Sequence, residues 1–172
     1  TPLYSSAASD VYKRQLQSFA QHAPPGTRLV VKEHPLDNGV RDWQLETNDL
    51  AQRFGIADRV DYLACGDIEA IAEQALGMVT VNSTSGTLAL ARGVPVVVLG
   101  KAVYDLPDMT FQDGLDRFWT EATPPDSATF AAFRRVLIET CLIPGGFFSD
   151  EAIGKVVAHA VARFEGQPLQ PD

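Results

Sequence analysis

Four short strand-like runs rich in valine alternate along this chain with segments of helical periodicity. The runs occupy residues 28–33, 60–63, 77–81 and 95–99. The last of them, PVVVL, is apolar throughout, which is typical of a parallel strand that is covered on both faces. Strands that alternate with helices predict right-handed crossovers. We therefore expect an α/β fold with a Rossmann-like parallel sheet and helices on both faces.

The segments between the runs carry helix signals of their own. Helices are predicted over residues 42–54, 68–75, 87–92, 130–140 and 151–164. Gly55 suits the C-terminal end of the first of these helices, and Asp67 suits the N-cap of the second. An earlier helix is expected to end at residue 22, because Pro24 and Pro25 follow. The last two helices are amphipathic and are expected to pack across the sheet.

The first residues differ in character from the rest. The chain does not begin with methionine, and the stretch SSAASDVYKRQ resembles translated sequencing-adapter sequence. We predict that residues 1–15 are a non-native leader, that 16–165 are the folded domain, and that 166–172 are a loose tail. If the leader is helical, Ser9 or Asp10 would cap it. The chain is expected to be a C-terminal fragment of a longer protein.

Composition limits the possible partners. Lys and Arg number 14 against 22 Asp and Glu, a formal net charge of −8. Such a surface repels phosphate backbones, so we expect no nucleic-acid partner, and any bound anion must be held by local geometry. No metal-ligand spacing is present, and neither metal nor cofactor is expected. Cys65 and Cys141 form no motif and are predicted to be buried thiols in a reducing cytoplasm.

No apolar run is as long as a bilayer span, and no signal peptide is recognisable, so a cytoplasmic protein is expected. The glycine pattern of dinucleotide sites and the phosphate-loop Gly-Lys-Ser are both missing. The Gly-x-Ser-x-Gly elbow of hydrolases is missing as well, because the residue two positions before Ser85 is Ser83 and not glycine.

The first candidate loop follows the first predicted strand. Lys32, Glu33, His34 and Pro35 stand at its carboxyl end, where ligands bind in open parallel sheets. Pro35 biases His34 toward an extended backbone, so that its imidazole could donate to a phosphate oxygen at the sheet edge. The alternative, which the dipeptide alone favours, is a histidine that hydrogen-bonds a turn.

The second candidate loop follows the third predicted strand. It consists of Asn82, Ser83, Thr84, Ser85 and Gly86. One hydroxyl can cap the following helix, and the others, with the free backbone N–H groups, could hold an anion. Glycine would let a ligand approach the backbone closely. An ordinary capped turn is an equally good interpretation of this loop alone. Together the two loops are expected to converge on one crevice, at the ends of neighbouring strands.

A longer set of segments resembles the capsule polysaccharide synthesis family, which includes the bacterial β-Kdo transferases. The segments are KEHPLD, VTVNSTSGTLAL, GVPVVVLGKAVYDLPDMT, GLDRFW, PPD and GGFF, between residues 30 and 148. The resemblance implies a GT-B-type glycosyltransferase with two Rossmann-like domains, of which residues 16–165 would be the C-terminal, nucleotide-sugar-binding domain. Asp108 and Met109 depart from the pattern, because the family usually has Gly-Leu there.

The resemblance also implies roles for residues. His34 and the hydroxyls of Ser83, Thr84 and Ser85 would hold the phosphate of a CMP-sugar such as CMP-Kdo, and His34 would stabilise the leaving phosphate. Lys32, Asn82 and Gly86 complete the expected binding set. The general base would be an acidic residue of the N-terminal domain, so this chain alone should not turn over. The full protein would use a lipid-linked acceptor, with possible peripheral association at the cytoplasmic face of the inner membrane.

Two other functions stay open on the sequence. One is a different sugar-nucleotide enzyme, such as an epimerase or another two-domain transferase. The other is a non-catalytic anion-binding or interaction domain. Tyr104, Phe118 and Trp119 are interpreted as packing residues that hold the loop after the fourth strand against the late helices, rather than as a stacking platform for cytosine.

Overall fold

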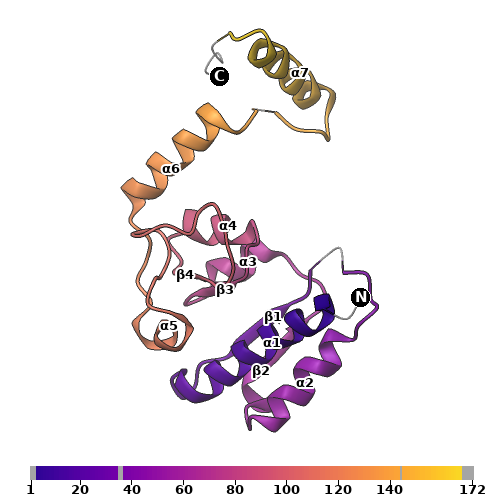
Figure 1. The fold of residues 1–172 in the computed structure, drawn as a ribbon, viewed down its shortest axis with the longest axis vertical. Helices are drawn as coiled ribbons and strands as arrows, with labels where there is room; N and C mark the ends of the chain where they lie inside the picture. Colours follow the sequence, from indigo (N-terminus) through magenta and orange to yellow (C-terminus); the bar gives the residue numbers. More distant parts are fainter. Residues whose placement is uncertain (1–2, 35–36, 144, 168–172) are drawn as a thin grey trace. The chain divides into compact units, whose positions relative to one another are not determined.

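The computed structural model describes residues 3–34, 37–143 and 145–167, with side chains from residue 10 onward. The chain divides into two compact units, Thr1–Asp126 and Ser127–Asp172. The first unit contains all the named strands and the helices α1 to α5, and the second contains α6 and α7 (Figure 1).

The strands of the first unit form two parallel pairs. β1 (Leu29–Lys32) pairs with β2 (Val60–Leu63), and β3 (Met78–Thr80) pairs with β4 (Val96–Val98). The α/β class with parallel strands is therefore confirmed. The expected single sheet is present, among the described residues, as two separate two-stranded sheets. Strands of three or four residues offer few backbone groups for lateral pairing, and the two halves are joined through helices instead.

Helices connect the two strands of each pair. α2 (Trp43–Arg53) and the 3₁₀ turn η1 (Ala57–Arg59) lie between β1 and β2, α3 (Ile68–Glu73) follows β2, and α4 (Ser85–Ala91) lies between β3 and β4. α4 begins at Ser85, two residues before the predicted start.

Local capping explains where α2 and α3 begin and where α2 ends. The Asp42 carboxylate accepts a hydrogen bond of 2.8 Å from the Leu45 N–H, and Asp67 accepts one of 2.9 Å from the Glu69 N–H. Each carboxylate satisfies a backbone donor that the first helical turn leaves unpaired. Gly55 ends α2 with a φ of 70°, a conformation that glycine adopts without steric cost. The predicted caps at Asp67 and Gly55 are confirmed.

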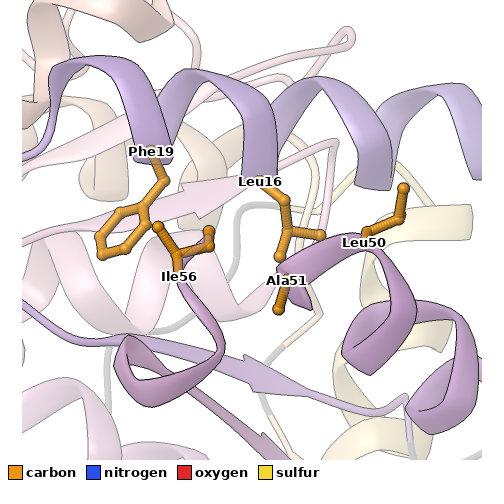
Figure 2. Close-up of a cluster of buried hydrophobic side chains, with 5 residues drawn as sticks. All are labelled: Leu16, Phe19, Leu50, Ala51 and Ile56. Carbon is orange, nitrogen blue, oxygen red and sulfur yellow. The ribbon is translucent and has the colours of Figure 1, made fainter. Parts of the chain in front are cut away.

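The long helix α1 (Leu3–His22) ends where the sequence predicts, before Pro24. Ser9 and Asp10 lie inside this helix, so the prediction of an N-cap there is wrong. The helix packs its apolar side on α2 and η1, where Leu16 and Phe19 meet Leu50, Ala51 and Ile56 (Figure 2). Burial of such side chains stabilises the fold by about 1.5–3 kcal/mol each.

A second cluster joins β4 to α5 (Leu115–Glu121), through Val97, Leu115 and Phe118. The neighbouring Trp119 reaches α1. Its ring meets Phe19 edge to face at 5.2 Å, and its indole N–H donates to the Ser18 hydroxyl at 2.8 Å. The packing role predicted for this part of the chain is confirmed. The partners of Trp119 are in α1, not in the late helices as expected.

The second unit contains α6 (Ser127–Thr140) and α7 (Asp150–Phe164). The Arg163 guanidinium of α7 donates to the carbonyl oxygens of Glu139 and Thr140, at 2.9 and 3.3 Å, which ties α7 to the end of α6. Both helices match their predicted ranges closely. Their packing across the sheet stays a prediction.

Cys65 and Cys141 are both free and exposed, so the prediction of buried thiols is wrong. Cys65 stands in the loop after β2, and Cys141 follows the last residue of α6, so neither belongs to a strand or helix face that packs inward. In the part of the chain that the structure describes, no cluster of His, Cys, Asp and Glu could hold a metal ion. Nor does any described helix have the length and apolar character to cross a membrane.

Candidate functional site

The first predicted loop lies at the carboxyl end of β1, as expected. The Glu33 N–H donates to the Leu63 carbonyl at 2.9 Å, which ties this end of β1 to the end of β2. The Lys32 ammonium donates to the Glu33 carbonyl at 2.7 Å, so it is engaged with its own loop. His34 is exposed, and its carbonyl accepts from the Asp37 N–H at 3.0 Å. Pro35, expected to orient His34, lies outside the described residues.

A stack of side chains, not predicted from the sequence, stands beside this loop. The Trp43 ring stacks on the Tyr12 ring with centroids 4.8 Å apart, and the Arg41 guanidinium lies over the Trp43 ring, 5.0 Å from its centroid. The Trp43 indole N–H donates to the Asp37 carboxylate at 3.1 Å. The stack therefore connects the segment after His34 to α1 and α2. Arg41 and Trp43 are neighbours in the sequence, but Tyr12 comes from α1, about thirty residues earlier, and no local pattern indicates its contact with Trp43.

Tyr62, near the end of β2, supports the same loop. Its hydroxyl donates to the Glu33 carboxylate at 2.6 Å. Burial raises the pKa of Tyr62, and the hydrogen bond to Glu33 and the charge of that carboxylate raise it further. The phenol therefore stays protonated at neutral pH and remains a donor.

The second predicted loop is a tightly bonded turn between β3 and α4. The Ser83 hydroxyl accepts from the Ser85 N–H at 3.2 Å and lies 3.1 Å from the Ser85 hydroxyl. The N–H groups of Gly86 and Thr87 donate to the carbonyls of Ser83 and Thr84, both at 3.0 Å. Several donors that were expected to be free for an anion are therefore engaged within the turn.

Asn82 and Thr84 differ from the two serines. Both residues are exposed, and within the described residues neither side chain makes a hydrogen bond. Thr84 is the N-cap of α4, but its hydroxyl does not cap the helix. These two side chains can bind a ligand without breaking an existing bond, and so can the proton of the Ser85 hydroxyl, because Ser85 is the acceptor in its bond with Ser83.

Gly86 is buried, and its surroundings explain why glycine stands there. A Cβ atom at this position would lie 2.6 Å from Cζ and 2.8 Å from Cε2 of Tyr104. The neighbour that excludes a side chain is therefore this ring. The predicted reason, close approach of a ligand to the backbone, stays a prediction.

The two loops lie on different strand pairs. The strands that precede them, β1 and β3, are therefore not neighbours in one sheet, contrary to the prediction. The convergence of the two loops on one crevice stays a prediction. An open hollow of about 500 Å³ lies elsewhere, beside the loop after β4, and four carboxylates are among its lining residues: Asp108, Asp113, Glu121 and Asp126. None of the predicted binding residues lines this hollow, and its acidic lining is unsuited to a phosphate.

The structure of the loop after β4 explains how Asp108 and Met109 fit where the family usually has Gly-Leu. Asp108 has a φ of 65°, in the left-handed region that favours glycine, and Met109 is buried. The backbone thus has the conformation that a glycine would favour, and aspartate is among the residues that tolerate it best.

Comparison with known proteins places these motifs in a family. The family model described as "Capsule polysaccharide biosynthesis protein" matches residues 3–148. The capsule polysaccharide modification protein LipB of Neisseria meningitidis is 40% identical over 136 residues, which are 78% of this chain and 32% of that protein. The capsule polysaccharide export protein KpsS of Escherichia coli is 33% identical over 129 residues, 75% of this chain and 33% of that protein.

The chain thus spans about a third of the length of the curated relatives it matches. No solved structure matches it. The family model covers most of the chain and includes both candidate loops and the loop after β4. The chain therefore belongs to the capsule polysaccharide biosynthesis family.

Proposed function

We propose that this chain is the C-terminal, CMP-sugar-binding part of a GT-B-type glycosyltransferase, a β-Kdo transferase that builds the lipid-linked linker of a capsule polysaccharide. The main support is family membership, together with two polar loops at the carboxyl ends of parallel strands. That is where open α/β sheets bind their ligands. The lipid-linked acceptor, the general base and any association with the inner membrane belong to the longer protein.

The nucleotide phosphate would be held by hydrogen bonds rather than by a basic surface, since the net charge is −8. His34 would donate from the first loop, with Lys32 beside it. From the second loop, the exposed side chains of Asn82 and Thr84 would bind directly. The Ser83 hydroxyl donates to the Ser85 hydroxyl, so Ser83 would have to rotate toward the phosphate, whereas Ser85 would donate its own proton without breaking that bond.

In the proposed reaction an acceptor hydroxyl attacks the anomeric carbon of Kdo. A carboxylate of the longer protein takes the hydroxyl proton. The bond between that carbon and the phosphate oxygen breaks, and its electron pair leaves with CMP. Negative charge therefore rises on the phosphate, where a donor such as His34 stabilises it. Loss of one such donor typically costs about 2.7–4 kcal/mol of barrier.

A titration with CMP and UMP, followed through the amide NMR signals of the chain, tests nucleotide binding. CMP should bind weakly but better than UMP, and the largest shifts should lie at residues 32–34 and 82–86. His34→Ala should weaken CMP binding, and the matched variant His159→Ala, in α7, should not. Stronger binding of UMP would favour another sugar-nucleotide enzyme. Failure of every nucleotide to bind would favour a non-catalytic domain.

A further inference from the structure

The strongest unassigned feature is a tyrosine that holds the Ser83 turn from another loop. Tyr104 comes from the loop after β4, and its side chain is 2% exposed. Its hydroxyl donates to the carbonyl oxygen of Ser83. The same oxygen accepts the Gly86 N–H at 3.0 Å, so Tyr104 adds a second donor to the bond that closes the turn.

The ring of Tyr104 also defines the shape of the turn. It fills the space where a Cβ atom at position 86 would stand. On the other side, the buried hydroxyl of Thr80 accepts the Ser83 N–H at 3.2 Å. Both backbone groups of Ser83 are therefore held by side chains from outside the turn, one at the end of β3 and one after β4.

The donor character of Tyr104 does not change near neutral pH. Burial raises the pKa of its phenol, because an ionised oxygen would lose hydration there. The hydroxyl therefore keeps its proton near neutral pH and remains able to donate to the Ser83 carbonyl.

We propose that Tyr104 is a positioning residue for the CMP-sugar site. It sets the backbone of the turn so that the exposed side chains of Asn82 and Thr84 meet the nucleotide phosphate together. Tyr104 itself, being buried, does not touch the ligand. This inference rests on the proposed function, because it assigns a purpose to a turn that is proposed to bind CMP.

The experiment compares two substitutions that each remove one donor and keep an aromatic ring. Tyr104→Phe removes the bond to Ser83, and Trp119→Phe removes the 2.8 Å bond from the Trp119 indole to Ser18. CMP affinity is measured by NMR titration at a temperature where both variants are folded, and melting temperatures are recorded beside it. The Thr84 amide nitrogen, which follows the Ser83 carbonyl, reports the lost bond directly.

Both variants should melt somewhat lower than the parent chain. Tyr104→Phe should weaken CMP binding about three- to tenfold, the effect expected for one lost hydrogen bond that orders the site. Trp119→Phe should bind CMP as the parent does. Unchanged affinity in Tyr104→Phe, or an equal loss in both variants, would overturn the positioning role and leave the proposed function intact. Absence of CMP binding by the parent chain would overturn the proposed function and this inference with it.

Discussion

The carbonyl oxygen of Asp108 accepts a hydrogen bond of 2.7 Å from the backbone N–H of Asp126, while Asp108 itself has a φ of 65°. The bond connects the loop after β4 to the last residue of the first unit. Asp108 thus has a left-handed backbone and also holds a long-range hydrogen bond. A change of its backbone conformation would break the bond to Asp126.

Substitution of Asp108 tests this conformation. Asp108→Ala should lower the free energy of unfolding by about 1–2 kcal/mol, because alanine tolerates the left-handed region poorly. Asp108→Gly should be close to neutral, since the relief of strain is offset by the greater freedom of the unfolded chain. Urea unfolding followed by tryptophan fluorescence is suitable, as Trp43 and Trp119 both lie in the first unit. The control is Asp113→Ala, at another exposed carboxylate. Equal stability of all variants would contradict the assignment of strain.

Gly86→Ala tests the packing of Tyr104 on the turn. Helix propensity alone would favour alanine by about 1 kcal/mol. The overlap with the Tyr104 ring should reverse the sign, and we expect a loss of about 1–3 kcal/mol, as for other overpacked sites. Gly154→Ala is the matched control, because nothing lies within 4 Å of a Cβ atom there. Thermal unfolding followed by circular dichroism should show a gain for the control. A gain for Gly86→Ala as well would show that the ring does not exclude a side chain.

Trp119→Ala tests whether this residue packs or binds the nucleotide. The ring contacts Phe19 and Phe118, and its N–H bonds to Ser18. Because the ring is only partly buried, the loss of stability should be near the lower end of the usual range, about 3 kcal/mol. The CMP affinity of the folded variant should not change. An unchanged melting temperature together with lost affinity would instead show that the indole stacks on the base.

The elements of this fold could be predicted where the signals are local. The strand over residues 60–63 and the caps at Asp67 and Gly55 depend on neighbouring residues in the sequence, and the structure confirms them. The start of α4 was placed two residues late, because the serines of the turn look like loop residues although Ser85 is already helical.

What could not be predicted depends on contacts between distant residues. The exclusion of a side chain at position 86 could not be predicted, because the ring responsible belongs to Tyr104, in another loop. The division into two strand pairs depends on which backbone groups meet, and strand-like sequence does not show this. The contact between the rings of Tyr12 and Trp43 likewise joins distant parts of the sequence. For the candidate site, the sequence indicated which two loops carry polar side chains. It did not indicate which of these polar groups hydrogen-bond to one another within the turn of residues 82–86.

The central claim is that His34 stabilises the phosphate of a departing CMP. The direct measurement is the single-turnover rate of Kdo transfer from CMP-Kdo in an intact family member that carries this stretch. His34→Ala and His34→Asn are compared there, with melting temperatures recorded for each variant. Because His34 is exposed, both variants should fold normally.

We expect His34→Ala to lower the rate by about 100- to 1,000-fold, the usual effect of removing one donor from a developing charge. His34→Asn should lower it less, because its amide can still donate a neutral hydrogen bond. Full activity in a stably folded His34→Ala enzyme would contradict the account, as would a loss of activity that follows the loss of folded protein in both variants.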